Sequence, residues 1–171
     1  ITIISLIFFC SSCSKSDKTI VSVLNTAESC MEQHPDSSLI ILNSINLNEI
    51  STKANKARYA LLKSIALDKN YIDVDDDSLT SISVAYYSKH GDADERLTAY
   101  LYNGRVYENA KDYERAMSNY LYAEKSVESC KNNNIIGRLY SSKSVLYNTI
   151  FEPQPAIEQA RLASSYFLKE G

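Results

Sequence analysis

The segment DVDDDS holds the side chains best placed for cation chemistry. Asp73, Asp75 and Asp77 alternate as the first ligands of an EF-hand calcium loop do. Such a loop then needs a glycine where Ser78 stands and a bidentate glutamate where Val84 stands, and neither is present. Acidic residues also gather at the positive N-terminus of a helix. We therefore expect this segment to start a helix capped by Asp77 or Ser78, in preference to binding calcium.

The histidines and nucleophilic side chains form no recognisable catalytic arrangement. His34 and His90 are the only histidines, and neither has cysteines or carboxylates nearby at the spacing of zinc ligands. The sequence contains no G-x-S-x-G elbow and no phosphate-binding loop. We therefore expect no catalytic residue, no metal site and no cofactor. The net charge of −3 also gives no electrostatic reason to expect nucleic-acid binding.

The start of the chain, ITIISLIFFCSSCSKSDK, joins an apolar run of about nine residues to small residues and cysteines. The run is too short to span a bilayer but suits the apolar part of a secretory signal. With its Cys-Ser-Ser-Cys end it resembles a bacterial lipoprotein signal, in which Cys13 would carry the lipid, although Cys10 stands where such signals usually have leucine. An ordinary cleaved signal and a CxxC metal or redox pair are the alternatives. We expect residues 1–13 to be a signal without its first residues, and residues 14–18 to be a short tether.

The rest of the chain has the pattern of a helical protein. Apolar residues recur at intervals of three and four, and no alternating strand pattern is found. Glycine (4) and proline (3) are scarce, whereas hydrophobic residues make up 44% of the chain, which favours packed helices. We predict eight helices in four hairpins within residues 19–171. The hairpins cover about 19–46, 52–90, 97–130 and 135–171.

The third hairpin has the most distinctive pattern of small and aromatic residues. Gly104 and Tyr107 lie on one helix, and Ala116, Tyr120 and Ala123 lie on the next, after a turn capped by aspartate. The pattern resembles the tetratricopeptide repeat, a helical hairpin of about 34 residues whose glycine and aromatics pack against alanines. We expect Gly104 to lie where the two helices approach most closely, opposite the alanines.

The fourth hairpin matches this pattern less closely, at an offset of about forty residues. Tyr140, Tyr147 and Ala156 fit, while Ser144 replaces the glycine. The first two hairpins agree mainly in their helical pattern. The resemblance implies an all-α fold in which about four helix–turn–helix hairpins form a right-handed superhelix, or α-solenoid.

The resemblance also implies a function. Such arrays bind an extended peptide or a partner helix in a groove lined by the first helix of each hairpin. Carried onto this chain, the groove positions are Tyr102, Arg105, Glu108, Arg138 and Asn148, the two arginines being suited to grip carboxylates. Alternatively, each is a solvated surface residue that pairs along its helix.

With the signal, these features describe a protein-binding scaffold in a bacterial cell envelope, lipid-anchored to a membrane or periplasmic. The alternative is the extracytoplasmic sensor region of a membrane-spanning transcriptional regulator with such repeats. The last helix has no polar cap, because Leu162, Tyr166 and Phe167 spread its apolar area widely. We therefore expect a longer array or self-association through this helix. Cys30 and Cys130 are expected to be free thiols.

Overall fold

The computed structural model of the protein describes residues 11–169 and contains helices and no strand within that range. The α-helices are α1 (Ser11–Cys30), α2 (Pro35–Asn43), α3 (Lys53–Lys69), α4 (Thr80–His90), α5 (Ala93–Asn109), α6 (Tyr113–Glu124), α7 (Asn133–Thr149) and α8 (Pro153–Phe167). Two short 3-10 helices, Leu47–Glu49 and Val127–Ser129, follow α2 and α6. No helix in the described range is long and apolar enough to cross a membrane.

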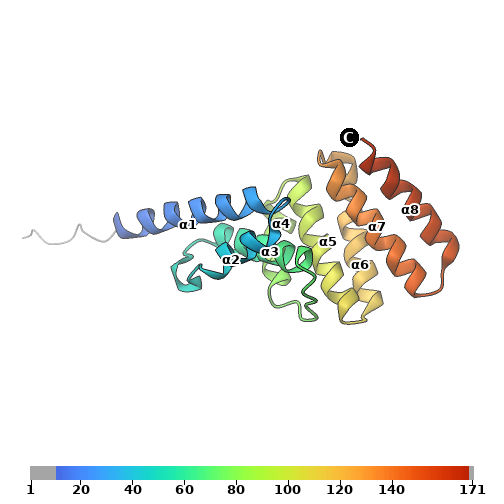
Figure 1. Cartoon of the computed structure of the whole chain (residues 1–171), viewed down its shortest axis with the longest axis horizontal. Helices are drawn as coiled ribbons and strands as arrows, with labels where there is room; N and C mark the ends of the chain where they lie inside the picture. Colours follow the sequence, from blue (N-terminus) through green and yellow to red (C-terminus); the bar gives the residue numbers. More distant parts are fainter. Residues whose placement is uncertain (1–10, 170–171) are drawn as a thin grey trace, which may run out of the picture.

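Because the described residues form helices and no strand, the all-α class is confirmed. Consecutive helices also pack as predicted: α1 on α2, α3 on α4, α5 on α6 and α7 on α8. Figure 1 shows α5 to α8 lying side by side, while α1 extends away from them toward the start of the chain. The apolar part of the expected signal, residues 1–10, lies outside the described residues. Residues 14–18, for which we expected a tether, belong to α1.

The start of each long helix recurs at an interval of 40 residues. Thr52, Asp92 and Asn132 are the N-caps of α3, α5 and α7, and each side chain accepts a hydrogen bond from the backbone N–H three residues later. Such a cap satisfies one of the N–H groups that a helix start leaves without an intrahelical partner. The Asp92 cap is reinforced because the Glu95 side chain accepts from the backbone N–H of Asp92.

The ends of the same helices recur at the same interval. Tyr71, Lys111 and Phe151 have φ of 58°, 61° and 63°, the left-handed conformation. In each case the next N–H donates to a carbonyl five residues earlier: Ile72 to Leu67, Asp112 to Tyr107 and Glu152 to Tyr147. This is the Schellman ending of a helix, found here without glycine. The three hairpins that begin with α3, α5 and α7 therefore share one local structure.

The acidic segment before α4 differs from our expectation. The N-cap of α4 is Leu79, which makes no side-chain cap, and the helix begins at Thr80. Asp77 is engaged elsewhere, because the Tyr107 hydroxyl donates to its Oδ2 at 2.5 Å. The Asp76 carboxylate accepts from the backbone N–H of Ser78 at 2.9 Å. The expected capping by Asp77 or Ser78 is therefore wrong.

The close approach at Gly104 is confirmed. A Cβ placed on Gly104 would lie 2.6 Å from Cδ1 of Tyr120 and 3.2 Å from the carbonyl oxygen of Ala116. The Tyr120 ring is fully buried in the core that α5, α6 and α7 share. Cys30 and Cys130 are free thiols, each partly buried.

Candidate binding groove

The first helices of all four hairpins line one hollow, which we call the groove. It has a volume of about 360 Å³. Its lining includes Met31 just after α1, Arg58 on α3, Tyr102 on α5 and Arg138 on α7. These residues are far apart in the sequence, so the groove exists only when the hairpins have packed together.

A second hollow of about 280 Å³ adjoins the groove, and we call it the arginine pocket. It shares Tyr102 and Arg138 with the groove and adds Arg105 from α5 and Phe167 from α8. Three of the five residues predicted for partner binding, Tyr102, Arg105 and Arg138, are therefore brought together here. Two cations and a phenol converge on one cavity, together with the carboxylate of Asp68.

Tyr102 lines both hollows. Tyr102 is only 4% exposed to solvent, and this burial raises the pKa of its phenol to about 12. The phenol is therefore neutral at physiological pH and can donate a hydrogen bond. Among residues 11–169 its hydroxyl has no hydrogen-bond partner. Tyr102 is therefore not a solvated surface residue, which was the alternative for each predicted groove position.

Arg105 is already paired in the arginine pocket. Its Nε donates to Oδ1 of Asp68 on α3 at 2.5 Å, and its Nη1 donates to Oγ of Ser142 on α7 at 3.4 Å. These contacts join three successive hairpins through one side chain. A bond from a charged donor to a charged acceptor is among the stronger hydrogen bonds in proteins. Arg105 is therefore fixed in position, with part of its guanidinium still facing the cavity.

Arg138 is held much more loosely. Its Nε donates to Oδ1 of Asn134, one helical turn earlier, at 2.9 Å. Its Nη2 lies 3.7 Å from Oε2 of Glu32, which is an ion pair but is too long for a hydrogen bond. The end of the guanidinium therefore retains free donors inside the cavity.

The other two predicted residues lie apart from this cluster. Glu108 is half-buried, and its Oε2 accepts a hydrogen bond from the Tyr120 hydroxyl at 2.6 Å. Burial raises the pKa of Glu108, which the Tyr120 hydrogen bond and Arg105 partly oppose. Asn148 is exposed near the end of α7. Neither residue lines the groove or the arginine pocket.

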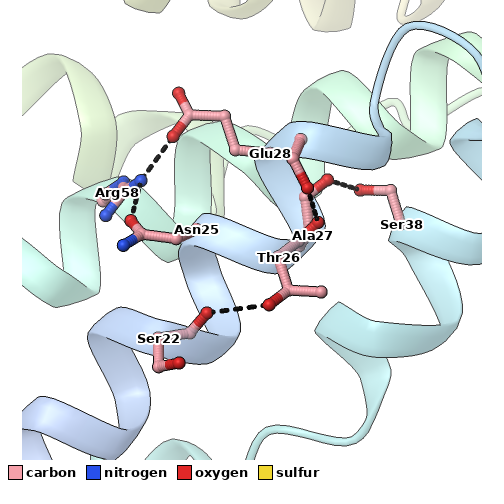
Figure 2. A network of polar contacts seen from close by, with 8 residues as sticks. Ser22, Asn25, Thr26, Ala27, Glu28, Ser38 and Arg58 are labelled. Atoms are coloured by element: carbon pink, nitrogen blue, oxygen red, sulfur yellow. Dashed lines mark hydrogen bonds and ion pairs between the residues drawn. The ribbon is translucent and has the colours of Figure 1, made fainter.

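Sequence reasoning missed the ion pairs that border the groove. Arg58 donates to Oδ1 of Asn25 at 2.7 Å and also pairs with Glu28, so that α3 is tied to α1 (Figure 2). Beside it, the Ser38 hydroxyl of α2 donates to the Ala27 carbonyl at 2.8 Å. The 40-residue interval could have indicated Arg58, because it stands two intervals before Arg138.

No group of three or more metal-ligating side chains lies together within the part of the chain that the structure describes. Cys13 falls in the first turns of α1. Comparison with known proteins finds no matching family model, no similar curated protein and no similar solved structure.

Proposed function

We propose that this chain is a binding scaffold of the tetratricopeptide type, whose groove holds an extended peptide or a partner helix. The observation that carries the proposal is the common lining of the groove by α1, α3, α5 and α7. The recurrence of caps and Schellman endings every 40 residues supports stacked hairpins of one kind, as in a right-handed α-solenoid.

The chemistry of the arginine pocket indicates what part of a partner it would hold. Arg138 offers free guanidinium donors, and Tyr102 offers a neutral hydroxyl without a partner. A carboxylate accepts several such bonds at once, and arginine can hold it at two points. Leu101 and Phe167 provide apolar walls beside the charged groups. We infer that the pocket binds a carboxylate that lies next to an apolar side chain.

The position of Cys13 suits an anchored scaffold. In Figure 1 the start of α1 points away from the packed hairpins α5 to α8. A lipid on Cys13 would therefore hold the protein at a bacterial membrane and leave the groove accessible. We propose this arrangement together with the binding function.

A displayed library of random peptides, panned on the full chain, tests the function. Thr98 lines the groove between Arg58 and Arg138 and is half-exposed, so Thr98→Trp should fill it. Ile157 is 46% exposed on α8, outside the groove and the pocket, and Ile157→Trp is the matched control. We expect selected peptides to bind the wild type and the control alike, and the Thr98→Trp variant at least about tenfold more weakly.

Equal binding to both tryptophan variants would place the peptide outside the groove. Circular dichroism of each variant checks that the helices are retained. Failure to select any peptide that binds the wild type would contradict the proposed function itself.

A further inference from the structure

We propose that Glu32 is a built-in competitor for the groove: in the free protein its carboxylate holds Arg138, and an acidic partner displaces it. This inference rests on the proposed function and adds the partner's chemistry and a control on binding. The partner's group would be an aspartate or glutamate side chain, or the carboxylate at the end of a chain.

Glu32 comes from a part of the chain far from Arg138. It lies in the turn after α1, in the first hairpin, yet its Oε2 is within 3.7 Å of Arg138 in the fourth. The same oxygen accepts a hydrogen bond from Nζ of Lys69, at the end of α3, at 2.8 Å. Both Glu32 and Arg138 line the groove. The contact therefore joins the first and fourth hairpins within the cavity that a partner would have to enter.

The contact of Glu32 with Lys69 is stronger than its contact with Arg138. The Lys69 side chain is only 11% exposed and lies at hydrogen-bonding distance from Glu32, so it fixes the carboxylate. The Glu32 side chain itself is 71% exposed, and its contact with Arg138 includes no hydrogen bond. Glu32 can therefore lose Arg138 while keeping Lys69. A partner's carboxylate that reaches the free donors of Arg138 would gain bonds that Glu32 does not make.

The other charged groups of the groove and the arginine pocket are held by stronger contacts than Arg138 is. Arg58 has two acceptors, Asn25 and Glu28, and Arg105 is bonded to Asp68 at 2.5 Å. On the acidic side, Asp94 accepts from the backbone N–H of Lys131, and Glu95 belongs to the cap of α5. These two carboxylates are thus engaged in holding the backbone. Arg138 is left as the cation whose present partner is easiest to replace.

The expected effect is modest, because exposed ion pairs contribute little. Such pairs are typically worth up to about 1 kcal/mol, which corresponds to about a fivefold change in a binding constant. Removing the Glu32 charge should therefore strengthen the binding of an acidic peptide by about two- to fivefold. Removing the Arg138 charge should weaken binding and should also abolish the gain from the Glu32 change.

The experiment measures fluorescence anisotropy with a labelled, capped peptide of alternating glutamate and alanine. The full-length wild type is compared with Glu32→Gln, Arg138→Gln and the double variant. Glu158→Gln is the control, because Glu158 is an exposed carboxylate on α8 that lines neither cavity. We expect Glu32→Gln alone to bind more tightly than Glu158→Gln, and the double variant to bind no better than Arg138→Gln.

Three results would overturn the proposal. If Glu32→Gln and Glu158→Gln bind the peptide with equal affinity, the effect comes from the protein's total charge and not from the position of Glu32. If the gain survives in the double variant, the displaced contact is not the one with Arg138. If neither the wild type nor Glu32→Gln binds the acidic peptide, the acidic partner is refuted. None of these results decides whether the groove binds peptides at all. That is tested separately, by whether library peptides of other chemistry bind the wild type and fail to bind Thr98→Trp.

Discussion

Gly104→Ala should destabilise the protein, although alanine is the better helix former. In an exposed helix interior the change would stabilise the folded state by about 1 kcal/mol. Here the added Cβ would lie 2.6 Å from Cδ1 of Tyr120 and closer still to Cε1. Contacts below 3.0 Å are not tolerated, so the ring or the helix must move.

The Tyr120 ring has little freedom to move. It is 0% exposed, and its hydroxyl is bonded to Glu108 at 2.6 Å. Forcing an extra methyl group into a packed core costs about 1–3 kcal/mol. Because the ring cannot move aside, we expect a cost in the upper part of this range, about 2–3 kcal/mol. After the gain in helix propensity of about 1 kcal/mol, the net loss is about 1–2 kcal/mol, or about 2–8 °C in melting temperature. Gly104→Leu should cost more, because the rest of its side chain has no space either.

Two further variants make this prediction sharp. Gly137→Ala also adds a Cβ, 2.5 Å from Cε1 of Phe167, but that ring is 39% exposed and can swing outward. We expect little or no loss of stability there. Tyr120→Leu removes the ring atoms, so the cost of Gly104→Ala should shrink in that background. Thermal unfolding followed by circular dichroism gives all of these values. An unchanged or raised melting temperature for Gly104→Ala would refute the packing argument.

Three other expectations can be checked separately. Burial raises the pKa of the Glu108 carboxyl above its ordinary 4.5 in the folded state. The protonated Glu108 therefore favours the folded state: this contribution to the unfolding free energy is complete below pH 4.5 and is lost as pH rises through the raised pKa. Glu108→Gln, which still accepts the Tyr120 hydroxyl, should therefore flatten the pH dependence of the unfolding free energy just above pH 4.5 in urea titrations. Cells fed a palmitate analogue should label the full-length protein but not Cys13→Ala, and equal labelling would exclude the anchor. Val145 and Leu168, 52% and 77% exposed, line a hollow of about 450 Å³ on α7 and α8. We expect a second copy to pack there, so sedimentation should show self-association that Val145→Glu with Leu168→Glu abolishes; a wild type that is monomeric at every concentration would contradict this.

The helices could be predicted from the sequence because local chemistry determines them. Periodic apolar residues give the helices, and capping residues such as Asp92 and Asp112 give their starts. The predicted start of a helix was wrong where a side chain makes a contact with a residue far away in the sequence. Asp77 is of a residue type that often caps helices, but its carboxylate accepts a hydrogen bond from the hydroxyl of Tyr107, 30 residues later.

The site could be predicted only in part, for a related reason. The repeat pattern pointed to Arg105 and Arg138, and both side chains line the arginine pocket. It could not indicate that Glu32 reaches Arg138, because that contact depends on how the first hairpin is placed against the fourth. It also could not show that Glu108 turns toward Tyr120 and so leaves the groove.

Residues 40 positions apart show why, among α3, α5 and α7, only the α5 position has the residues of the arginine pocket. Equivalent positions in the neighbouring hairpins have the same backbone, so each junction between hairpins could form such a pocket. At the position of Arg105 the neighbours have Ile65 and Val145, and at the position of Tyr102 they have Leu62 and Ser142. Of these three helices, α5 alone has an arginine and a tyrosine at the two compared positions. A repeated backbone thus lines the groove, and residues found in a single repeat place the guanidinium and the phenol that we propose to bind a carboxylate.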